Sequence, residues 1–170
     1  VEFTAAPRMK PDGNQCFAYS IMLDESFQSV SPTNTTLGQI HQIGGPKGYA
    51  GGLPSVPPVI QFDARNDYFD LNFHELRGSS TNVTEKSIYY QLIPINDMKG
   101  KWTDISFCLD FVNLNISVWV NGEKKLNIDK APINTNLKPS SIYFKHGIYR
   151  SFISKYKTKH GTEVMPTQIV

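Results

Sequence analysis

The chain has 170 residues and a formal net charge of +2 at pH 7. This length is enough for one domain with its own hydrophobic core, and the weak charge does not favour nucleic-acid binding. The sequence contains no apolar run long enough to cross a membrane as a helix.

Almost every periodic segment repeats with period two, which is the pattern of β-strands. After a strand-like start at Val1-Glu2-Phe3, strands are predicted at residues 16–23, 37–43, 59–64, 68–76, 87–93, 102–111, 116–120, 123–128, 142–155 and 165–170. Residues 44–58 form a Gly/Pro-rich loop, and long loops in compact domains are often binding loops. We find no helix with a capping box and no internal repeat.

Two hairpins are predicted, one around Arg65-Asn66-Asp67 and one around Asn121-Gly122. An Asn-Gly pair between alternating strands is a strong hairpin signal, because both turn positions favour positive φ. In the strand at 68–76 the two faces are expected to separate, with Phe69, Leu71 and Phe73 inward and Asp70, Asn72 and His74 outward.

About ten strands, with turns every 8–12 residues, predict an all-β fold. We expect a β-jelly roll, a two-sheet antiparallel sandwich with a concave substrate groove. The chain is interpreted as a single domain over residues 1–170. Both ends are abrupt, so we expect that sequence is missing at one or both of them.

The chain has two cysteines, Cys16 and Cys108, which are too few for a disulfide framework. Both lie in apolar, strand-like segments, and two buried free thiols are the preferred interpretation. A single disulfide between neighbouring strands is the alternative. Neither cysteine has a partner at metal-ligand spacing. Three glycosylation sequons, which begin at Asn34, Asn82 and Asn115, favour a secreted protein.

The most informative segment is residues 143–151. Read as a strand, it directs Phe144, Ile148 and Phe152 to the core, and Tyr143, Lys145, Gly147, Tyr149 and Ser151 to the opposite face. About a hundred residues upstream, Gln39 and His41 also share a face. If these polar faces lie in one curved sheet, they form a groove suited to a hydrated polymer rather than to a small apolar ligand.

Five short segments occur in an order that resembles a known family. They are Gln39-Ile40-His41, Pro57-Pro58, Lys101-Trp102-Thr103-Asp104-Ile105, Val118-Trp119-Val120-Asn121-Gly122 and Tyr143-Phe144-Lys145-His146-Gly147-Ile148-Tyr149-Arg150. The order resembles the jelly-roll polysaccharide lyases, that is, the glucuronan lyase and heparin lyase I group and the related alginate lyases. The resemblance covers most of the chain. The family usually carries an Arg-X-Glu strand near its start; here only the glutamate, Glu2, is present, and the arginine would precede Val1.

The resemblance implies β-elimination at a uronic acid. The C5 proton becomes acidic enough to leave only when donors neutralise the neighbouring carboxylate. Gln39 takes that role, Lys145 adds positive charge, and Tyr143 is expected to contact the substrate. His41 is the expected base and Tyr149 the acid that protonates O4. In some relatives one tyrosine serves both steps and the histidine only neutralises the carboxylate; both schemes stay open here.

We therefore expect a secreted lyase that acts on a glucuronan-like polysaccharide, because residues 147–150 resemble that version of the motif. Alginate is the second substrate, and a non-catalytic carbohydrate-binding module is the alternative function. The expected partner is an acidic polysaccharide, with no nucleic acid or membrane, and the protein is expected to be a monomer. No cofactor and no catalytic metal are required, since there is no phosphate loop or dinucleotide fingerprint; the resemblance allows a structural calcium.

Several further polar and aromatic residues are expected either at the border of the groove or away from it. His74 and Arg65 are secondary candidates for its border. Trp119 is expected to pack rather than to stack on a sugar, and His146 is expected to be structural. The basic residues of the C-terminal third indicate either a solvated edge or a basic strand that faces an acidic sugar. They include Lys145, Arg150, Lys155, Lys157 and Lys159.

Overall fold

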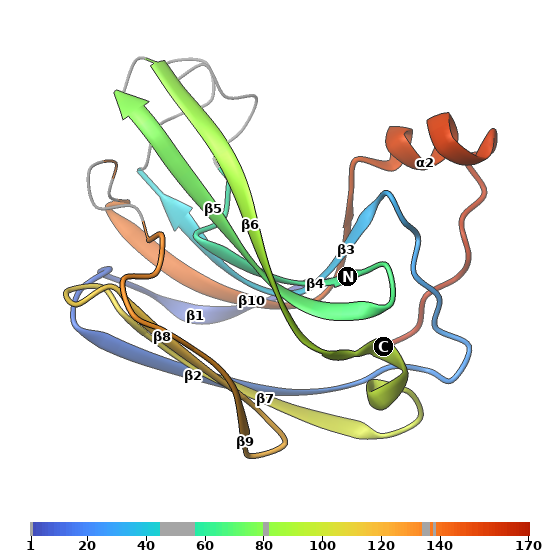
Figure 1. Ribbon diagram of the computed structural model, residues 1–170, viewed down its shortest axis with the longest axis horizontal. Helices are drawn as coiled ribbons and strands as arrows, with labels where there is room; N and C mark the ends of the chain where they lie inside the picture. Colours follow the sequence, from blue (N-terminus) through green and yellow to red (C-terminus); the bar gives the residue numbers. More distant parts are fainter. Residues whose placement is uncertain (1, 45–56, 80–81, 134–136, 138) are drawn as a thin grey trace.

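The computed structural model describes residues 2–44, 57–79, 82–133, 137 and 139–170, and in them the chain forms two antiparallel β-sheets (Figure 1). One sheet has six strands in the order β1-β10-β3-β4-β5-β6, and the other has four in the order β2-β7-β8-β9. This two-sheet sandwich confirms the predicted all-β jelly roll.

The strands follow the period-two segments of the sequence closely. The larger sheet contains β1 (Glu2–Met9), β10 (Ser141–Ser151), β3 (Asn34–Ile43), β4 (Ile60–Arg65), β5 (Tyr68–Ser79) and β6 (Asn82–Pro94). The smaller sheet contains β2 (Asn14–Met22), β7 (Trp102–Asp110), β8 (Asn115–Val120) and β9 (Glu123–Ile128). A short 3-10 helix, η1 (Ile95–Met98), follows β6, and one α-helix, α2 (Ile153–His160), follows β10. Most of the loop predicted at 44–58 lies outside the described residues.

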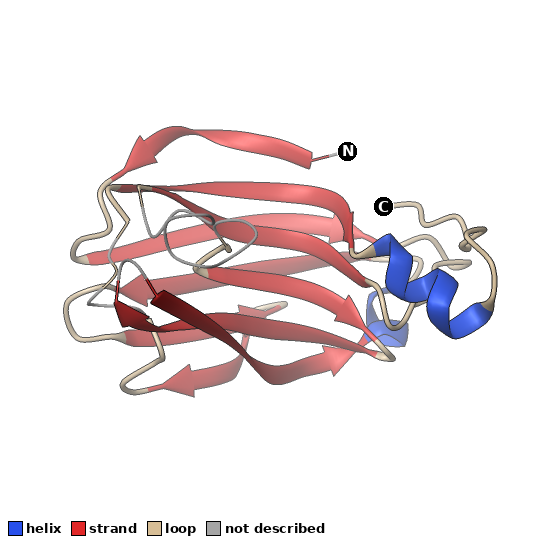
Figure 2. Ribbon diagram, turned by 90° about the horizontal axis from the view of Figure 1, so that it is seen from above, coloured by secondary structure: helices blue, strands red, loops and turns tan. Residues whose placement is uncertain are grey.

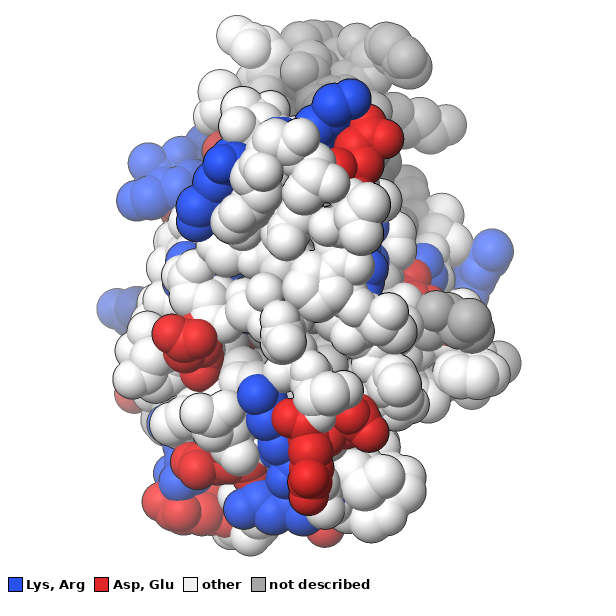
Figure 3. Space-filling model, turned by 90° about the vertical axis from the view of Figure 1, so that its right-hand side faces the viewer, with Lys and Arg blue, Asp and Glu red and all other residues white. Residues whose placement is uncertain are grey.

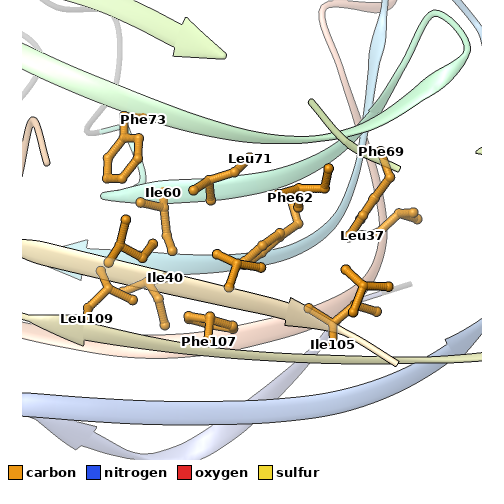
Figure 4. Close-up of a cluster of buried hydrophobic side chains, with 14 of the residues drawn as sticks. Leu37, Ile40, Ile60, Phe62, Phe69, Leu71, Phe73, Ile105, Phe107 and Leu109 are labelled. Carbon is orange, nitrogen blue, oxygen red and sulfur yellow. The ribbon is translucent and has the colours of Figure 1, made fainter. Parts of the chain in front are cut away.

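The hydrophobic core fills the space between the two sheets (Figure 4). The rings of Phe62 and Phe107, which come from opposite sheets, have their centroids 4.8 Å apart. Phe69, Leu71 and Phe73 are fully buried, as their alternation predicts. Burial of each such side chain contributes about 1.5–3 kcal/mol, so the inward face of each strand is fixed, and the polar residues between them are left on the outer face.

Both predicted hairpins are confirmed. Asn66 between β4 and β5 has φ 53°, and Asn121 and Gly122 between β8 and β9 have φ 51° and 78°. In the second hairpin both central positions have positive φ, which matches the twist of the flanking strands.

The preferred interpretation of the two cysteines as buried free thiols is wrong. Cys16 on β2 lies directly opposite Cys108 on β7, and the two form a disulfide with a Cα–Cα distance of 4.0 Å. The bond lies on the outer face of the four-stranded sheet, where Cys16 is exposed. The pairing arises from the register of two strands that are 92 residues apart, and neither local sequence nor spacing reveals such a register.

The C-terminal region departs most from expectation. β10 ends at Ser151, and residues 153–160 form the surface helix α2 instead of a strand that continues to 155. Phe152 has φ 57° and is 63% exposed, so its predicted place in the core is wrong. Residues 165–170 form no strand. The alternation of lysines at 155, 157 and 159 imitates a strand, but α2 buries none of its side chains, so local propensity and end contacts decide its conformation.

No helix in the described part of the chain is long and apolar enough to cross a membrane.

Candidate active site

A groove of about 570 Å³ runs over the concave outer face of the six-stranded sheet. β5 and β6 rise on one side of it, and α2 lies at one end of the strands (Figures 1 and 2). Four of the five predicted site residues line this groove, namely Gln39 and His41 from β3 and Lys145 and Tyr149 from β10. The fifth, Tyr143, lies beside it.

The pairing of β10 with β3 brings these residues together. Lys145 lies directly opposite Gln39, and Tyr143 directly opposite His41. Directly opposed residues of an antiparallel pair project to the same face of the sheet. Two segments that are about a hundred residues apart thus form one polar patch.

A β-bulge separates Lys145 from Tyr149. The register of β10 against β3 shifts between His146 and Tyr149, so that Gly147 and Ile148 together oppose one residue, Leu37. Gly147 has φ 121°, a conformation that side chains with a Cβ rarely adopt. Strand alternation does not reveal this bulge, although an isolated glycine inside a strand is its usual signal. Beyond the bulge Tyr149 is 46% exposed and lines the groove.

Glu2 connects the two residues that are predicted to bind a carboxylate. The Gln39 side-chain amide donates to one Glu2 carboxylate oxygen, and Lys145 Nζ lies 3.5 Å from the other. Gln39 is only 2% exposed, so its amide has little freedom to turn elsewhere. The sequence alone marks Glu2 only as the remaining part of the Arg-X-Glu strand. The structure places it on β1 opposite Gly147, where it holds two hydrogen-bond donors that line the groove.

His41 is partly buried beneath the groove. Burial lowers its pKa below the usual value of a histidine, and the positive charge of Lys145 adds to this effect, so the ring is mainly neutral near pH 7. The Gln42 backbone N–H donates to His41 Nδ1 at 2.9 Å, and the Gln42 carbonyl oxygen is 3.2 Å from the same atom. The Tyr143 ring packs on the imidazole with a centroid distance of 5.4 Å. Tyr143 is therefore placed to hold His41, and its contact with a substrate stays a prediction.

The opposite wall of the groove contains a second histidine, His74. Its Nδ1 is bonded to a Glu85 carboxylate oxygen, and its Nε2 lies 2.6 Å from Gln61 Oε1 and 3.3 Å from Asn72 Nδ2. All four residues line the groove, as predicted for His74. This network offers polar atoms to a hydrated ligand along the wall that β4, β5 and β6 form.

Two carboxylates lie under this wall. Asp63 is fully buried and accepts a hydrogen bond of 2.7 Å from Thr36 Oγ1, and burial raises its pKa. Burial also raises the pKa of Asp70, although Arg65 forms an ion pair with it at 2.9 Å. The Arg65 guanidinium stacks on the Tyr89 ring at 3.9 Å. Arg65 itself does not line the groove; it supports Tyr89, which does.

The remaining candidates lie elsewhere. His146 stacks on Phe3 and Tyr19, which agrees with a structural role. Trp119 belongs to β8 in the other sheet, and Lys124 covers its ring at 5.1 Å, so it cannot reach the groove. Within the described ranges, no group of three or more His, Cys, Asp or Glu could hold a metal ion.

A family model described as polysaccharide lyase matches residues 1–166. No curated protein sequence matches the chain.

Solved structures share the fold at low sequence identity. An endo-β-1,4-glucuronan lyase from the fungus Trichoderma reesei aligns with a TM-score of 0.69 and 14% identity, over 98% of this chain and 67% of that one. The alginate lyase AlyC3 aligns with a TM-score of 0.57 and 18% identity, over 87% and 62%. A polysaccharide lyase family-7 alginate lyase, A1-II′, aligns with a TM-score of 0.54 and 16% identity, over 84% and 55%. The chain thus spans between about half and two thirds of these proteins.

Proposed function

Because this chain belongs to the polysaccharide lyase family, we propose that it cleaves a uronate-containing polysaccharide of the glucuronan type by β-elimination. One observation carries the proposal: Gln39, Lys145, His41 and Tyr149 line a single groove on adjacent strands. A binding module needs donors for a carboxylate, but it does not need an acid and base beside them.

The first task of the site is to neutralise the carboxylate at C5 of the sugar. The Gln39 amide and the Lys145 ammonium both point to the Glu2 carboxylate. The Gln39 amide has a second N–H, and the Lys145 ammonium has two further N–H groups, which a substrate carboxylate in the groove would accept. Donors that are fixed before the reaction stabilise charge where it develops, here on the enolate-like intermediate.

The second task is proton transfer. A base removes the C5 proton, a double bond forms between C4 and C5, the C4–O4 bond breaks, and an acid protonates the departing O4. Tyr149 is exposed in the groove and is the proposed acid. His41, neutral near pH 7, and Tyr149 itself are the two candidates for the base. Each positioned acid or base is worth roughly 10²–10⁴ in rate.

The contact at His41 Nδ1 bears on the role of this histidine. If Nδ1 accepts the Gln42 N–H at 2.9 Å, the neutral ring carries its proton on Nε2. Nε2 would then donate to the substrate carboxylate, and Tyr149 would serve both proton-transfer steps. If Nδ1 instead donates to the Gln42 carbonyl at 3.2 Å, Nε2 is free to act as the base. The shorter contact favours the first arrangement.

A glucuronan-like substrate is supported by the resemblance of residues 147–150 to the glucuronan and heparin lyase motif. The structural likeness to the Trichoderma reesei glucuronan lyase is consistent with it. We also propose a secreted protein, because disulfides such as Cys16–Cys108 persist in oxidising compartments.

The test is to incubate the purified chain with glucuronan, alginate and heparin, and to follow the ultraviolet absorbance of the unsaturated product. Absorbance should rise with glucuronan and should not rise with the Tyr149→Phe variant. Binding of glucuronan without any rise in absorbance would contradict the proposal and indicate a carbohydrate-binding module. Cleavage of alginate alone would show that the substrate is alginate instead of glucuronan, and the proposed β-elimination would stand.

A further inference from the structure

We propose that Phe152 and Lys155 form a separate sugar subsite at the α2 end of the groove, in which the aromatic ring supports a pyranose face and the ammonium binds a uronate carboxylate. This inference rests on the proposed function, because it names how the same groove would hold a neighbouring unit of the polymer.

The first observation is the exposure of Phe152. The side chain is 63% exposed, although phenylalanine is usually buried, and it lines the groove that contains Tyr149. Its backbone has φ 57° and ψ 46°, a left-handed conformation that is unfavourable for a bulky residue. Strained residues of this kind cluster at ligand sites, where the surrounding structure holds them in place.

The surrounding structure does hold Phe152. Its carbonyl oxygen accepts hydrogen bonds from Thr33 Oγ1 at 3.2 Å and from the Lys155 backbone N–H at 2.9 Å. The C-terminal end of α2 contacts the loop that contains Thr33, since His160 Nε2 lies 2.9 Å from the Ser31 carbonyl oxygen. These hydrogen bonds hold the backbone of Phe152 in place, and therefore also the position of its ring in the groove.

The second observation is the cation above the ring. Lys155 Nζ lies 4.2 Å from the centroid of Phe152, and Lys155 also lines the groove. In the described part of the chain no carboxylate forms an ion pair with Lys155, whereas Lys157, on the same helix, pairs with Glu163 at 2.8 Å. The flexible lysine stem can move from the ring face to an incoming carboxylate.

The charges on the face around α2 are mixed in sign. Figure 3 faces the side of the molecule where α2 lies, and acidic and basic groups are interspersed there around a wide uncharged area. A broad positive field is therefore absent from the part of this face that the structure describes. Selectivity for an acidic sugar at this end would come from one lysine beside one aromatic ring.

The place of Phe152 along the groove suits a neighbouring sugar unit. Phe152 follows the end of β10, three residues after Tyr149, and both side chains line the groove. A unit stacked on Phe152 would therefore lie beyond the unit on which Tyr149 acts. Short substrates would miss this subsite, and longer ones would fill it.

The experiment measures kcat/KM of the full chain on a ladder of glucuronan oligosaccharides. In the wild type, kcat/KM should rise when the substrate becomes long enough to reach Phe152. Phe152→Ala should lose about three- to tenfold on these long substrates, as expected for one aromatic contact, and nothing on the shortest one that is cleaved. Phe152→Trp should keep the length preference.

Phe152→Gly separates a structural role from a binding role. Glycine adopts positive φ without strain, so this variant should be at least as stable as the wild type in thermal unfolding, and should still lose the length preference. An equal loss on all substrate lengths would overturn the subsite.

Lys155→Gln tests the charge, with Lys157→Gln as its matched control. The wild type should prefer native oligosaccharides to the same oligosaccharides with reduced carboxyl groups. Lys155→Gln should lose part of this preference on long substrates only, and Lys157→Gln should keep it.

Two outcomes distinguish the subsite from the enzyme itself. If the wild type cleaves glucuronan but Phe152→Ala and Lys155→Gln keep its length profile, the subsite is refuted and the proposed function stands. If the wild type cleaves no uronate polymer, the proposed function fails, and calorimetric titration of the same oligosaccharides decides on the subsite. Weaker binding of long oligosaccharides by both variants would support it, whereas equal binding, or none at all, would overturn it.

Discussion

At the scale of single residues, the roles of Tyr149 and His41 can be separated by conservative changes. Tyr149→Phe should lower kcat by about 10²–10⁴ and leave the melting temperature unchanged, because the side chain is 46% exposed. Tyr89→Phe is a matched control, since Tyr89 lines the same groove but has no assigned proton transfer; it should lose little. A similar loss in both variants would contradict the assignment.

The same approach tests the tautomer of His41. If His41 only donates to the carboxylate, His41→Gln keeps a donor and should retain activity within about tenfold of the parent, whereas His41→Ala should lose much more. If His41 is the base, both variants should be equally inactive. Steady-state rates of the two variants distinguish these schemes.

The pKa of His41 gives a further prediction. Burial and Lys145 both lower this pKa, because each disfavours the imidazolium. An NMR titration of the His41 ring should therefore give a value below about 6.5, the usual value for histidine. In Lys145→Met the positive neighbour is gone, so the pKa should rise towards that value. An unchanged or lower pKa in Lys145→Met would show that the two side chains do not interact as described.

At the scale of one element, strand β10 depends on its bulge. Gly147 has φ 121°, so Gly147→Ala should cost about 1–3 kcal/mol in backbone strain. Because the strain lies between Lys145 and Tyr149, kcat should fall as well. Gly13→Ala is the control, since Gly13 has φ 60° with open space around it and precedes β2 in the other sheet. It should lose stability in denaturant unfolding and keep kcat.

The elements also show what local sequence can predict. Alternation places Phe69, Leu71 and Phe73 in the core, and it puts Gln39 and His41 on one outer face, because the hydrophobic effect acts on each strand separately. Alternation cannot predict how β10 and β3 align, since register is set between strands. The family resemblance led us to expect these residues in one groove, and the structure gives the pairing of Lys145 with Gln39.

Three other features, the end of β10, the disulfide and the role of Glu2, do not follow from strand alternation. Phe152 reads as the next inward residue of a strand, but a left-handed turn at this position ends β10 and begins α2. The disulfide, in contrast, depends on a long-range contact, because Cys16 and Cys108 become neighbours only when β2 and β7 have paired. Glu2 gains its role from one residue on each of two neighbouring strands, which no spacing within β1 could indicate.

At the scale of the whole molecule, the disulfide and the groove lie on different sheets. The bond closes a loop with a sequence separation of 92 residues, and a bond of this kind typically adds ~2–4 kcal/mol to the free energy of unfolding. The double variant Cys16→Ser, Cys108→Ser should therefore melt at a lower temperature. Its kcat at ambient temperature should match the parent, because neither cysteine lines the groove. A large drop in kcat without unfolding would mean that the two sheets are coupled.

Glu2 lies on β1, an edge strand of the six-stranded sheet, and this position has a consequence for catalysis. Among the strands that the structure describes, β1 pairs only with β10, and edge strands of this kind open more often than central strands. Each opening would withdraw the Glu2 carboxylate and let the amide of Gln39 and the ammonium of Lys145 turn away from their aligned positions. The fraction of molecules with an intact site would then depend on how often β1 separates from β10. Changes in kcat should therefore correlate with the amide hydrogen-exchange rates of β1 more closely than with those in the interior of either sheet.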